Sequence, residues 1–222
     1  MAMHKFYILD FDRTLADSDK LLEVFIQVSE EFLAIPRSVI EAADADVKKR
    51  GDSFDTAGFV RNYLIEHDRL DQWDSLVKRF IHESRSLDML LPGANELTNL
   101  LDSRGDRYGI LTYGNPLWQG LKLSAAGFNH VPHIVTTNKR KGALISTWQL
   151  DDESFAIPQE LGGGVADLVV LIDDKAVSFA DFPPLPSYGF HVLDLQNALP
   201  AQIGDIPDNV TAVTSLLDVV SS

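Results

Sequence analysis

The stretch Phe6-Tyr7-Ile8-Leu9-Asp10-Phe11-Asp12-Arg13-Thr14 places two carboxylates directly after four apolar residues, close to the start of the chain. Its apolar part has the length and composition of a short β-strand that is covered on both faces. Carboxylates held close together at the end of a buried strand repel one another and resist desolvation, so they are costly as purely structural residues. The stretch therefore predicts a strand followed by Asp10 and Asp12, which form either part of a functional site or, as is common for Asp-x-Asp after a strand, a turn or helix cap.

Two later stretches repeat this pattern of an apolar run that ends in polar residues. Tyr108-Gly109-Ile110-Leu111 is followed by Thr112, and Leu168-Val169-Val170-Leu171-Ile172 is followed by Asp173 and Asp174. Continuous apolar runs of this length are typical of parallel strands with helices on both faces. Weaker strand candidates are residues 133–136 and 190–193.

The segment between the first two strands is helical in pattern. Apolar residues recur at helical spacing, and the expected helices cover residues 19–34, 38–50, 59–67 and 72–84. Ser38 is a plausible capping residue for the second helix. Aromatic residues such as Trp73 and Phe80 fit the core of this segment better than a substrate-binding surface. A further helix, residues 94–101, follows the Pro92-Gly93 turn.

The order of these elements predicts an α/β fold, a Rossmann-like parallel sheet with an inserted all-helical cap. Strands alternate with helices after the second strand, which is the pattern of such a sheet. Residues 17–88 form a helical stretch too long for a crossover connection and are interpreted as the cap. The α/β core is then expected to comprise residues 1–16 and 89–222.

Composition and charge narrow the functional class. The chain has 222 residues, 19 Lys plus Arg against 33 Asp plus Glu, a net charge of -14, and no cysteine. The acidic balance argues against a nucleic-acid partner, and the lack of cysteine excludes disulfides, thiolate zinc sites and a cysteine nucleophile. The first apolar run is too short for a signal-peptide core, and no later segment approaches a membrane span. We expect a cytoplasmic protein, a monomer or homodimer, with no membrane partner.

The polar strand ends predict one shared site. Ligands bind outside the carboxyl ends of the strands in open α/β sheets, and parallel strands align those ends on one edge. The side chains expected to converge there are Asp10, Asp12, Thr112, Asp173 and Asp174. A divalent cation resolves the repulsion among these carboxylates, and Mg²⁺ prefers oxygen ligands together with waters and substrate phosphate.

The motifs in this order are similar to those of the haloacid dehalogenase-like (HAD) hydrolase superfamily, phosphatase type with a helical (C1-type) cap. The resemblance covers residues 5 to about 180 outside the cap, and the Pro92-Gly93 turn is usual in that family. The matching motifs are Asp10-x-Asp12-x-Thr14, a strand ending in Thr112, a lysine further on, and a strand ending in Asp173-Asp174. Arg13 stands where the family more often has glycine.

The resemblance implies a Mg²⁺-dependent phosphohydrolase acting on a small phosphorylated substrate. Asp10 would be the nucleophile that forms an aspartyl-phosphate, and Asp12 the acid and base for the leaving oxygen and the water. Phosphate would be bound by Phe11, Thr112, Tyr113 and a lysine.

The same resemblance implies the metal ligands and the lysine. Mg²⁺ would be bound by Asp10, by the backbone carbonyl of Asp12, and by the acidic pair, with Asp174 direct and Asp173 direct or through water. Lys141 and Lys139 both lie in the interval expected for the lysine, and Lys141 is favoured because a helix start follows it.

Alternative functions within the same fold are a phosphomutase and a phosphonate hydrolase. A 2-haloacid dehalogenase needs no acid for its leaving group, so Asp12 argues against that activity. A catalytically silent binding or regulatory protein would have no need of the complete set of motif residues. Substrate identity resides in the cap, of which the sequence reveals only the helical pattern.

Overall fold

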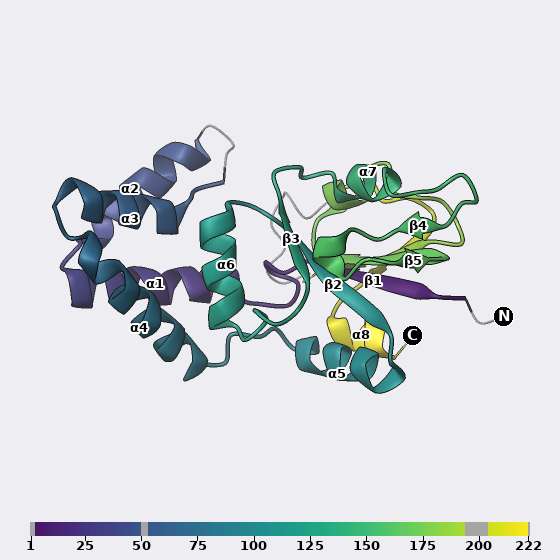
Figure 1. The fold of residues 1–222 in the computed structure, drawn as a ribbon, viewed down its shortest axis with the longest axis horizontal. Helices are drawn as coiled ribbons and strands as arrows, with labels where there is room; N and C mark the ends of the chain where they lie inside the picture. Colours follow the sequence, from purple (N-terminus) through teal and green to yellow (C-terminus); the bar gives the residue numbers. More distant parts are fainter. Residues whose placement is uncertain (1–2, 50–52, 194–203, 222) are drawn as a thin grey trace. The chain divides into compact units, whose positions relative to one another are not determined.

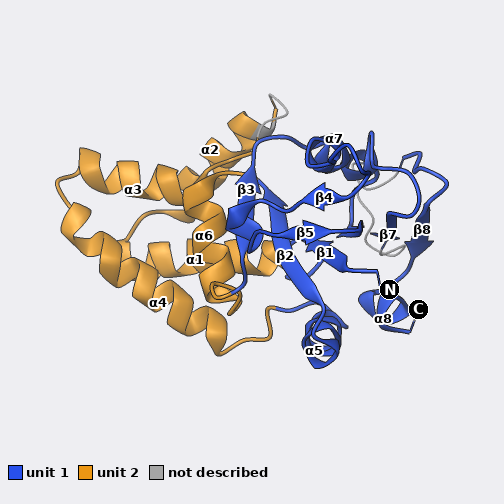
Figure 2. Ribbon diagram, turned by 45° about the vertical axis from the view of Figure 1, so that its right-hand side comes forward, with its two compact units in different colours: residues 1–16, 90–113, 131–222 blue, residues 17–89, 114–130 orange. Residues whose placement is uncertain are grey.

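The computed structural model describes residues 3–49, 53–193 and 204–221, and the chain divides into two compact units. One unit comprises residues 1–16, 90–113 and 131–222, and the other comprises residues 17–89 and 114–130 (Figure 2). The first unit contains the β-sheet, and the second is all-helical. Among the described helices, none is long and apolar enough to cross a membrane.

The first unit is built on a six-stranded parallel sheet with the strand order β3-β2-β1-β6-β7-β8. Figure 1 labels the first three of these strands. The strands are β1 (Lys5–Leu9), β2 (Arg107–Tyr113), β3 (His133–Thr136), β6 (Leu168–Asp173), β7 (Tyr188–Val192) and β8 (Val210–Val213). A separate antiparallel pair consists of β4 (Phe155–Ala156) and β5 (Val165–Ala166). The predicted α/β fold with a Rossmann-like parallel sheet is confirmed.

The two central strands are the most buried part of this sheet. All six residues of β6 are buried, as are the last four of β1. Leu9 pairs with Ile172, and the backbone N–H of Asp10 donates to the Ile172 carbonyl at 2.9 Å, so the ladder continues to the strand ends. Burial of each large aliphatic side chain contributes about 1.5–3 kcal/mol. The apolar runs that predicted β1 and β6 therefore also form part of the hydrophobic core, and their burial stabilises the sheet.

The described helices of the sheet unit are short. They are α5 (Ala94–Arg104), α7 (Lys141–Ser146) and α8 (Leu216–Val220), with the 3-10 turns η2 (Gln159–Leu161) and η3 (Ala176–Phe179). Gly93 precedes α5 with φ 89°, and a Cβ there would lie 2.8 Å from the Leu217 backbone N. Only glycine fits this turn without displacement of the backbone of α8. The predicted helix start at Pro92-Gly93 is confirmed.

The helical unit contains α1 (Ser18–Leu33), α2 (Arg37–Lys48), α3 (Thr56–Glu66), η1 (Leu70–Gln72), α4 (Trp73–Arg85) and α6 (Pro116–Ala125). Its core includes a cluster of three aromatic rings, Phe25 of α1, Phe80 of α4 and Trp118 of α6, with ring centres 4.9 to 5.8 Å apart. The prediction that Phe80 is a core residue is confirmed, whereas Trp73 is half-buried. Because Trp118 packs in this cluster, the unit includes α6, which the expected range of 17–88 omits.

The prediction that Ser38 is the N-cap residue of the second helix is wrong. The N-cap of α2 is Pro36, with φ -60° and no side-chain hydrogen bond, so Ser38 lies inside the first turn. Proline holds this φ without cost and has no N–H to satisfy, so it starts the helix two residues early. The described part of the helix ends at Lys48, and the expected end at Arg50 lies outside the described residues.

Candidate active site

Three carboxylates meet at the carboxyl ends of the central strands. Asp10 follows β1, Asp173 is the last residue of β6, and Asp174 comes next. One oxygen from each of the three lies within 4.8 Å of the others, and all three side chains are buried. The structure thus brings together three of the four residues predicted to bind metal. We call Asp10, Asp173 and Asp174 the carboxylate cluster.

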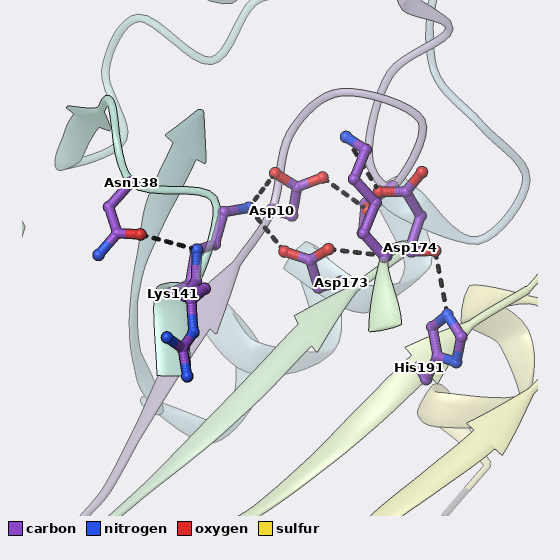
Figure 3. Close-up of polar contacts among 9 residues, drawn as sticks. Asp10, Asn138, Lys141, Asp173, Asp174 and His191 are labelled. Carbon is purple, nitrogen blue, oxygen red and sulfur yellow. Dashed lines mark hydrogen bonds and ion pairs between the residues drawn. The ribbon is translucent and has the colours of Figure 1, made fainter. Parts of the chain in front are cut away.

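Lys141, the first residue of α7, donates to two members of the cluster. Its Nζ contacts Asp10 Oδ1 and lies 2.6 Å from Asp173 Oδ2 (Figure 3). Lys139, the other candidate, is exposed, and its Nζ lies 5.4 Å from the centre of the Tyr113 ring. The structure therefore places Lys141, and not Lys139, against the carboxylates.

The turn after β1 positions the side chain of Asp10. Thr14 Oγ1 donates to Asp10 Oδ2 at 2.9 Å, and the Leu15 and Ala16 N–H groups donate to the Phe11 carbonyl at 3.0 Å. Arg13 has φ 62°, a conformation in which a non-glycine residue costs about 1 kcal/mol. This positive φ explains why glycine would suit the position of Arg13. The tight turn brings the Thr14 hydroxyl against the Asp10 carboxylate.

Asp12 lies in the same turn and outside the carboxylate cluster. It is half-buried and bridges to Ala16 in the backbone. The expected roles of its side chain as acid and base, and of its backbone carbonyl as a metal ligand, stay predictions.

Two residues that the sequence did not single out contact the acidic pair. The Lys175 backbone N–H donates to Asp173 Oδ1 at 2.8 Å, and Lys175 Nζ lies 3.7 Å from Asp174 Oδ1. His191 of β7 is buried, and its Nε2 lies 3.1 Å from the Asp174 carbonyl oxygen, as Figure 3 shows. The pairing of His191 with Asp173 across β6 and β7 explains its place. The histidine spacing carried no such signal.

Burial and charge act in opposite directions on these carboxyl groups. Burial raises the pKa of Asp10, but the ammonium groups of Lys141 and Lys175 outweigh it and hold that pKa below its usual value. Burial and then the charge of Asp10 raise the pKa of Asp174 to about 7, and burial also raises the pKa of Asp173. Burial lowers the pKa of Lys141, but the charges of Asp10 and Asp173 more than reverse this. Asp10 is thus the member held most firmly as an anion.

Thr112 of β2 is the buried hydroxyl at the neighbouring strand. Its Oγ1 has no hydrogen-bond partner among the described residues. A buried hydroxyl without a partner costs about 1–3 kcal/mol, so the group fits a ligand oxygen. Phe11 directly follows Asp10, and Tyr113 ends β2. The contacts of these three residues with phosphate stay a prediction.

The donor set of the cluster fits a hard divalent cation. Three carboxylates supply only oxygen ligands, and their mutual repulsion is relieved by a positive ion at their centre. Mg²⁺ and Ca²⁺ take such ligands, and Mg²⁺ commonly uses few carboxylates and fills its shell with water and phosphate oxygens.

Known structures place this geometry in a recognised fold. A haloacid dehalogenase-like hydrolase from Burkholderia xenovorans matches at TM-score 0.64 with 18% identity, over 99% of this chain and 96% of that chain. A HAD phosphatase from Thermococcus onnurineus matches at TM-score 0.61 with 17% identity, over 98% and 96%. This chain has the HAD-like fold. Comparison with protein-family models and with curated proteins yields no match.

Further HAD-like structures differ in what they bind or do. A HAD hydrolase from Bacillus subtilis, described as bound to magnesium, matches at TM-score 0.54 with 12% identity, over 99% of this chain and 98% of that chain. Dehalogenases are also among the matching structures. The HAD-like fold by itself therefore leaves the reaction open, and the site residues must decide it.

Proposed function

We propose that the chain is a Mg²⁺-dependent phosphohydrolase that forms an aspartyl-phosphate on Asp10. The observation that carries the proposal is the buried carboxylate cluster, with Lys141 bound to the oxygens of Asp10 and Asp173. A nucleophilic carboxylate must be ionised, and the depressed pKa of Asp10 meets this requirement at neutral pH.

The residues divide the reaction into two displacements at phosphorus. A carboxylate oxygen of Asp10 attacks the phosphoryl group, and the leaving oxygen takes a proton from Asp12. Asp12 then takes a proton from a water molecule, which attacks the same phosphorus, releases phosphate and regenerates Asp10. The oxygen of Asp10 that binds Lys141 keeps the carboxylate oriented throughout. The Thr112 hydroxyl and the Lys141 ammonium stabilise the phosphoryl oxygens.

Asp10, Asp174 and the backbone carbonyl of Asp12 are the direct metal ligands in this proposal, and Asp173 acts directly or through water. When bound, the ion offsets the repulsion between the anionic nucleophile and the phosphate. The magnesium described for one HAD-like structure of the same fold supports this choice of ion.

The presence of Asp12 favours phosphoryl transfer over carbon–halogen cleavage. Halide is a stable leaving group and needs no proton, whereas an alkoxide leaving group does. Asp12 lies two residues after the nucleophile, on the same turn. Asp12 therefore argues against dehalogenation, although dehalogenases share the fold.

The substrate class proposed is a small phosphorylated metabolite. In this proposal the inserted helical unit, residues 17–89 with 114–130, acts as the cap, and caps of this kind exclude water and bulky substrates. A phosphomutase or a phosphonate hydrolase uses the same nucleophile, so a panel of phosphate esters, phosphonates and sugar phosphates identifies the substrate.

The first test is hydrolysis of p-nitrophenyl phosphate by the wild type and by Asp10→Asn, each with Mg²⁺ and with EDTA. Activity is expected only for the wild type with Mg²⁺. Equal rates in all four conditions would refute the phosphatase proposal. Chloride release from 2-chloropropionate, without hydrolysis of phosphate esters, would establish the dehalogenase alternative.

A further inference from the structure

A second ammonium group lies beside the carboxylate cluster, in addition to Lys141. Lys175 directly follows the acidic pair, and its Nζ lies 3.7 Å from Asp174 Oδ1. Its charge also acts on Asp10, where it is the second cation after Lys141 that favours the carboxylate. The roles proposed above use Lys141 and leave Lys175 without one.

The local backbone holds Lys175 at this place. Its N–H donates to Asp173 Oδ1 at 2.8 Å, which closes a tight turn between the end of β6 and the start of η3 at Ala176. This turn fixes the Cα of Lys175 next to the acidic pair, so its side chain has only a short distance to cover to reach Asp174.

Lys141 and Lys175 differ in how easily the ammonium group can move away from the carboxylate cluster. The side chain of Lys141 is 3% exposed and binds two carboxylates, whereas that of Lys175 is 33% exposed and makes one longer contact, with Asp174. A long lysine side chain that is one-third exposed can extend its ammonium into water. Lys141 is therefore a fixed part of the site, and Lys175 is a displaceable one.

The charges explain what Lys175 does when the cluster holds no ion. With all three carboxyl groups ionised, the single charge of Lys141 leaves an excess of two negative charges in a buried region, which is strongly unfavourable. Lys175 reduces that excess to one and does so at Asp174, a proposed direct metal ligand. A cation entering the cluster would meet this ammonium as a competitor for the same oxygen.

We propose that Lys175 is an internal counter-cation that stabilises the metal-free protein and competes with Mg²⁺ for Asp174. This inference rests on the proposed metal site. It predicts two effects of opposite sign: removal of the Lys175 charge destabilises the metal-free protein and tightens Mg²⁺ binding.

The test is Lys175→Met, which keeps the length and apolar stem of the side chain and removes its charge. Mg²⁺ binding is measured by titration calorimetry, and thermal unfolding is measured in EDTA and in excess Mg²⁺. We expect the dissociation constant for Mg²⁺ to fall about tenfold, or about 1.4 kcal/mol. We also expect a lower Tm in EDTA, with part of the loss recovered in Mg²⁺.

Three further variants make the result specific. Lys175→Arg keeps the charge and is expected to behave as the wild type, and Lys175→Gln is a second neutral substitution in case the methionine variant does not fold. Lys78→Met, at an exposed lysine of α4, removes one charge from the chain elsewhere and is expected to change neither quantity.

Unchanged or weaker Mg²⁺ binding by both neutral variants would overturn the inference. An equal loss of Tm in EDTA and in Mg²⁺ would also overturn it, since that is the behaviour of a purely structural contact. Asp174→Asn separates this failure from that of the proposed function. If the wild type binds Mg²⁺ and Asp174→Asn does not, only the role of Lys175 is at stake; if neither binds, the metal site itself falls.

Discussion

In each unit of the molecule a basic residue pairs with more than one carboxylate, and the two groups lie in opposite environments. In the sheet unit Lys141 faces the carboxylate cluster, and both it and its partners are buried. In the helical unit Arg37 lies 2.6 Å from Glu23, 3.6 Å from Glu41 and 4.0 Å from Glu30, with its side chain 31% exposed and its partners more so.

The difference between these two arrangements is one of solvation rather than of charge. Water screens the Arg37 network, so its ion pairs contribute little to stability and any of them is replaceable. The carboxylate cluster has lost that solvent, so its residual negative charge must be met by lysines or by a bound ion. Burial of this kind is typical of a site that handles charge in its reaction.

The largest expected effect is on activity: a change in the carboxylate cluster should abolish it, whereas a change in the Arg37 network should not affect it. Asp10→Asn should lower the rate of p-nitrophenyl phosphate hydrolysis by about 10³-fold or more, because an amide is not a nucleophile. Glu23→Gln, the matched change in the Arg37 network, should leave the rate unaltered. Comparable losses in both variants would show that activity reports folding and not chemistry.

Much of the carboxylate cluster was predictable from sequence, because the apolar runs that form the buried strands end at the residues that form the cluster. A buried strand needs an apolar run, and a carboxylate at its end has no structural reason to be there. Asp10, Asp173 and Asp174 therefore stood out at the positions where the structure brings them together. Lys141 was favoured over Lys139 because a helix start follows it, and the structure places Lys141 against the carboxylates at the first residue of α7.

The places of Lys175, His191 and α6 were not predicted from the sequence. In the sequence Lys175 cannot be told apart from an ordinary surface lysine. The turn in which its N–H donates to Asp173 places it at the site. His191 reaches the Asp174 carbonyl from a different strand. Helix α6 has the pattern of any crossover helix, and its membership of the helical unit follows from the contacts of Trp118.

The next effect concerns stability. Lys141→Met leaves buried carboxylates without their cation and should lower the free energy of unfolding in EDTA by about 3 kcal/mol. Arg37→Met should lower it by less than about 1 kcal/mol, since its carboxylate partners stay hydrated. Urea unfolding of both variants measures the difference. Equal losses would contradict the contrast drawn between the two regions.

A smaller effect, with a defined pH window, is expected at Asp174. Its pKa is raised from 3.8 to about 7 in the folded protein, by burial and by the charge of Asp10. The unfolded chain therefore releases this proton first as pH rises, and the stability present below pH 3.8 is lost progressively up to about pH 7.

Asp174→Asn removes this pH-dependent loss of stability, because an amide does not ionise. In EDTA at pH 8 the variant should be more stable than the wild type by on the order of 2 kcal/mol, and this advantage should disappear at pH 4. It should also gain no stability from Mg²⁺. Urea unfolding at the two pH values, with and without the metal, measures both. A variant less stable than the wild type at pH 8 in EDTA would contradict the charge-repulsion account.

The smallest effect is the response of the exposed network to salt. The stability difference between the wild type and Arg37→Met should shrink by a few tenths of a kcal/mol between about 0.1 M and 1 M NaCl, because the Debye length falls from about 10 Å to 3 Å. The difference for Lys141→Met should change less, since its partners are shielded from solvent ions. The opposite order would mean that burial does not separate the two sets of charges.

The most direct test of the central claim is to look for the phosphorylated enzyme itself. The protein is mixed with Mg²⁺ and a phosphate ester that it hydrolyses, quenched in acid within one turnover, digested, and examined by mass spectrometry. The account predicts one added phosphoryl group on Asp10, present in the wild type with Mg²⁺ and absent in EDTA and in Asp10→Asn. Phosphate release with no phosphorylated peptide, or with the phosphoryl group on another residue, would contradict it.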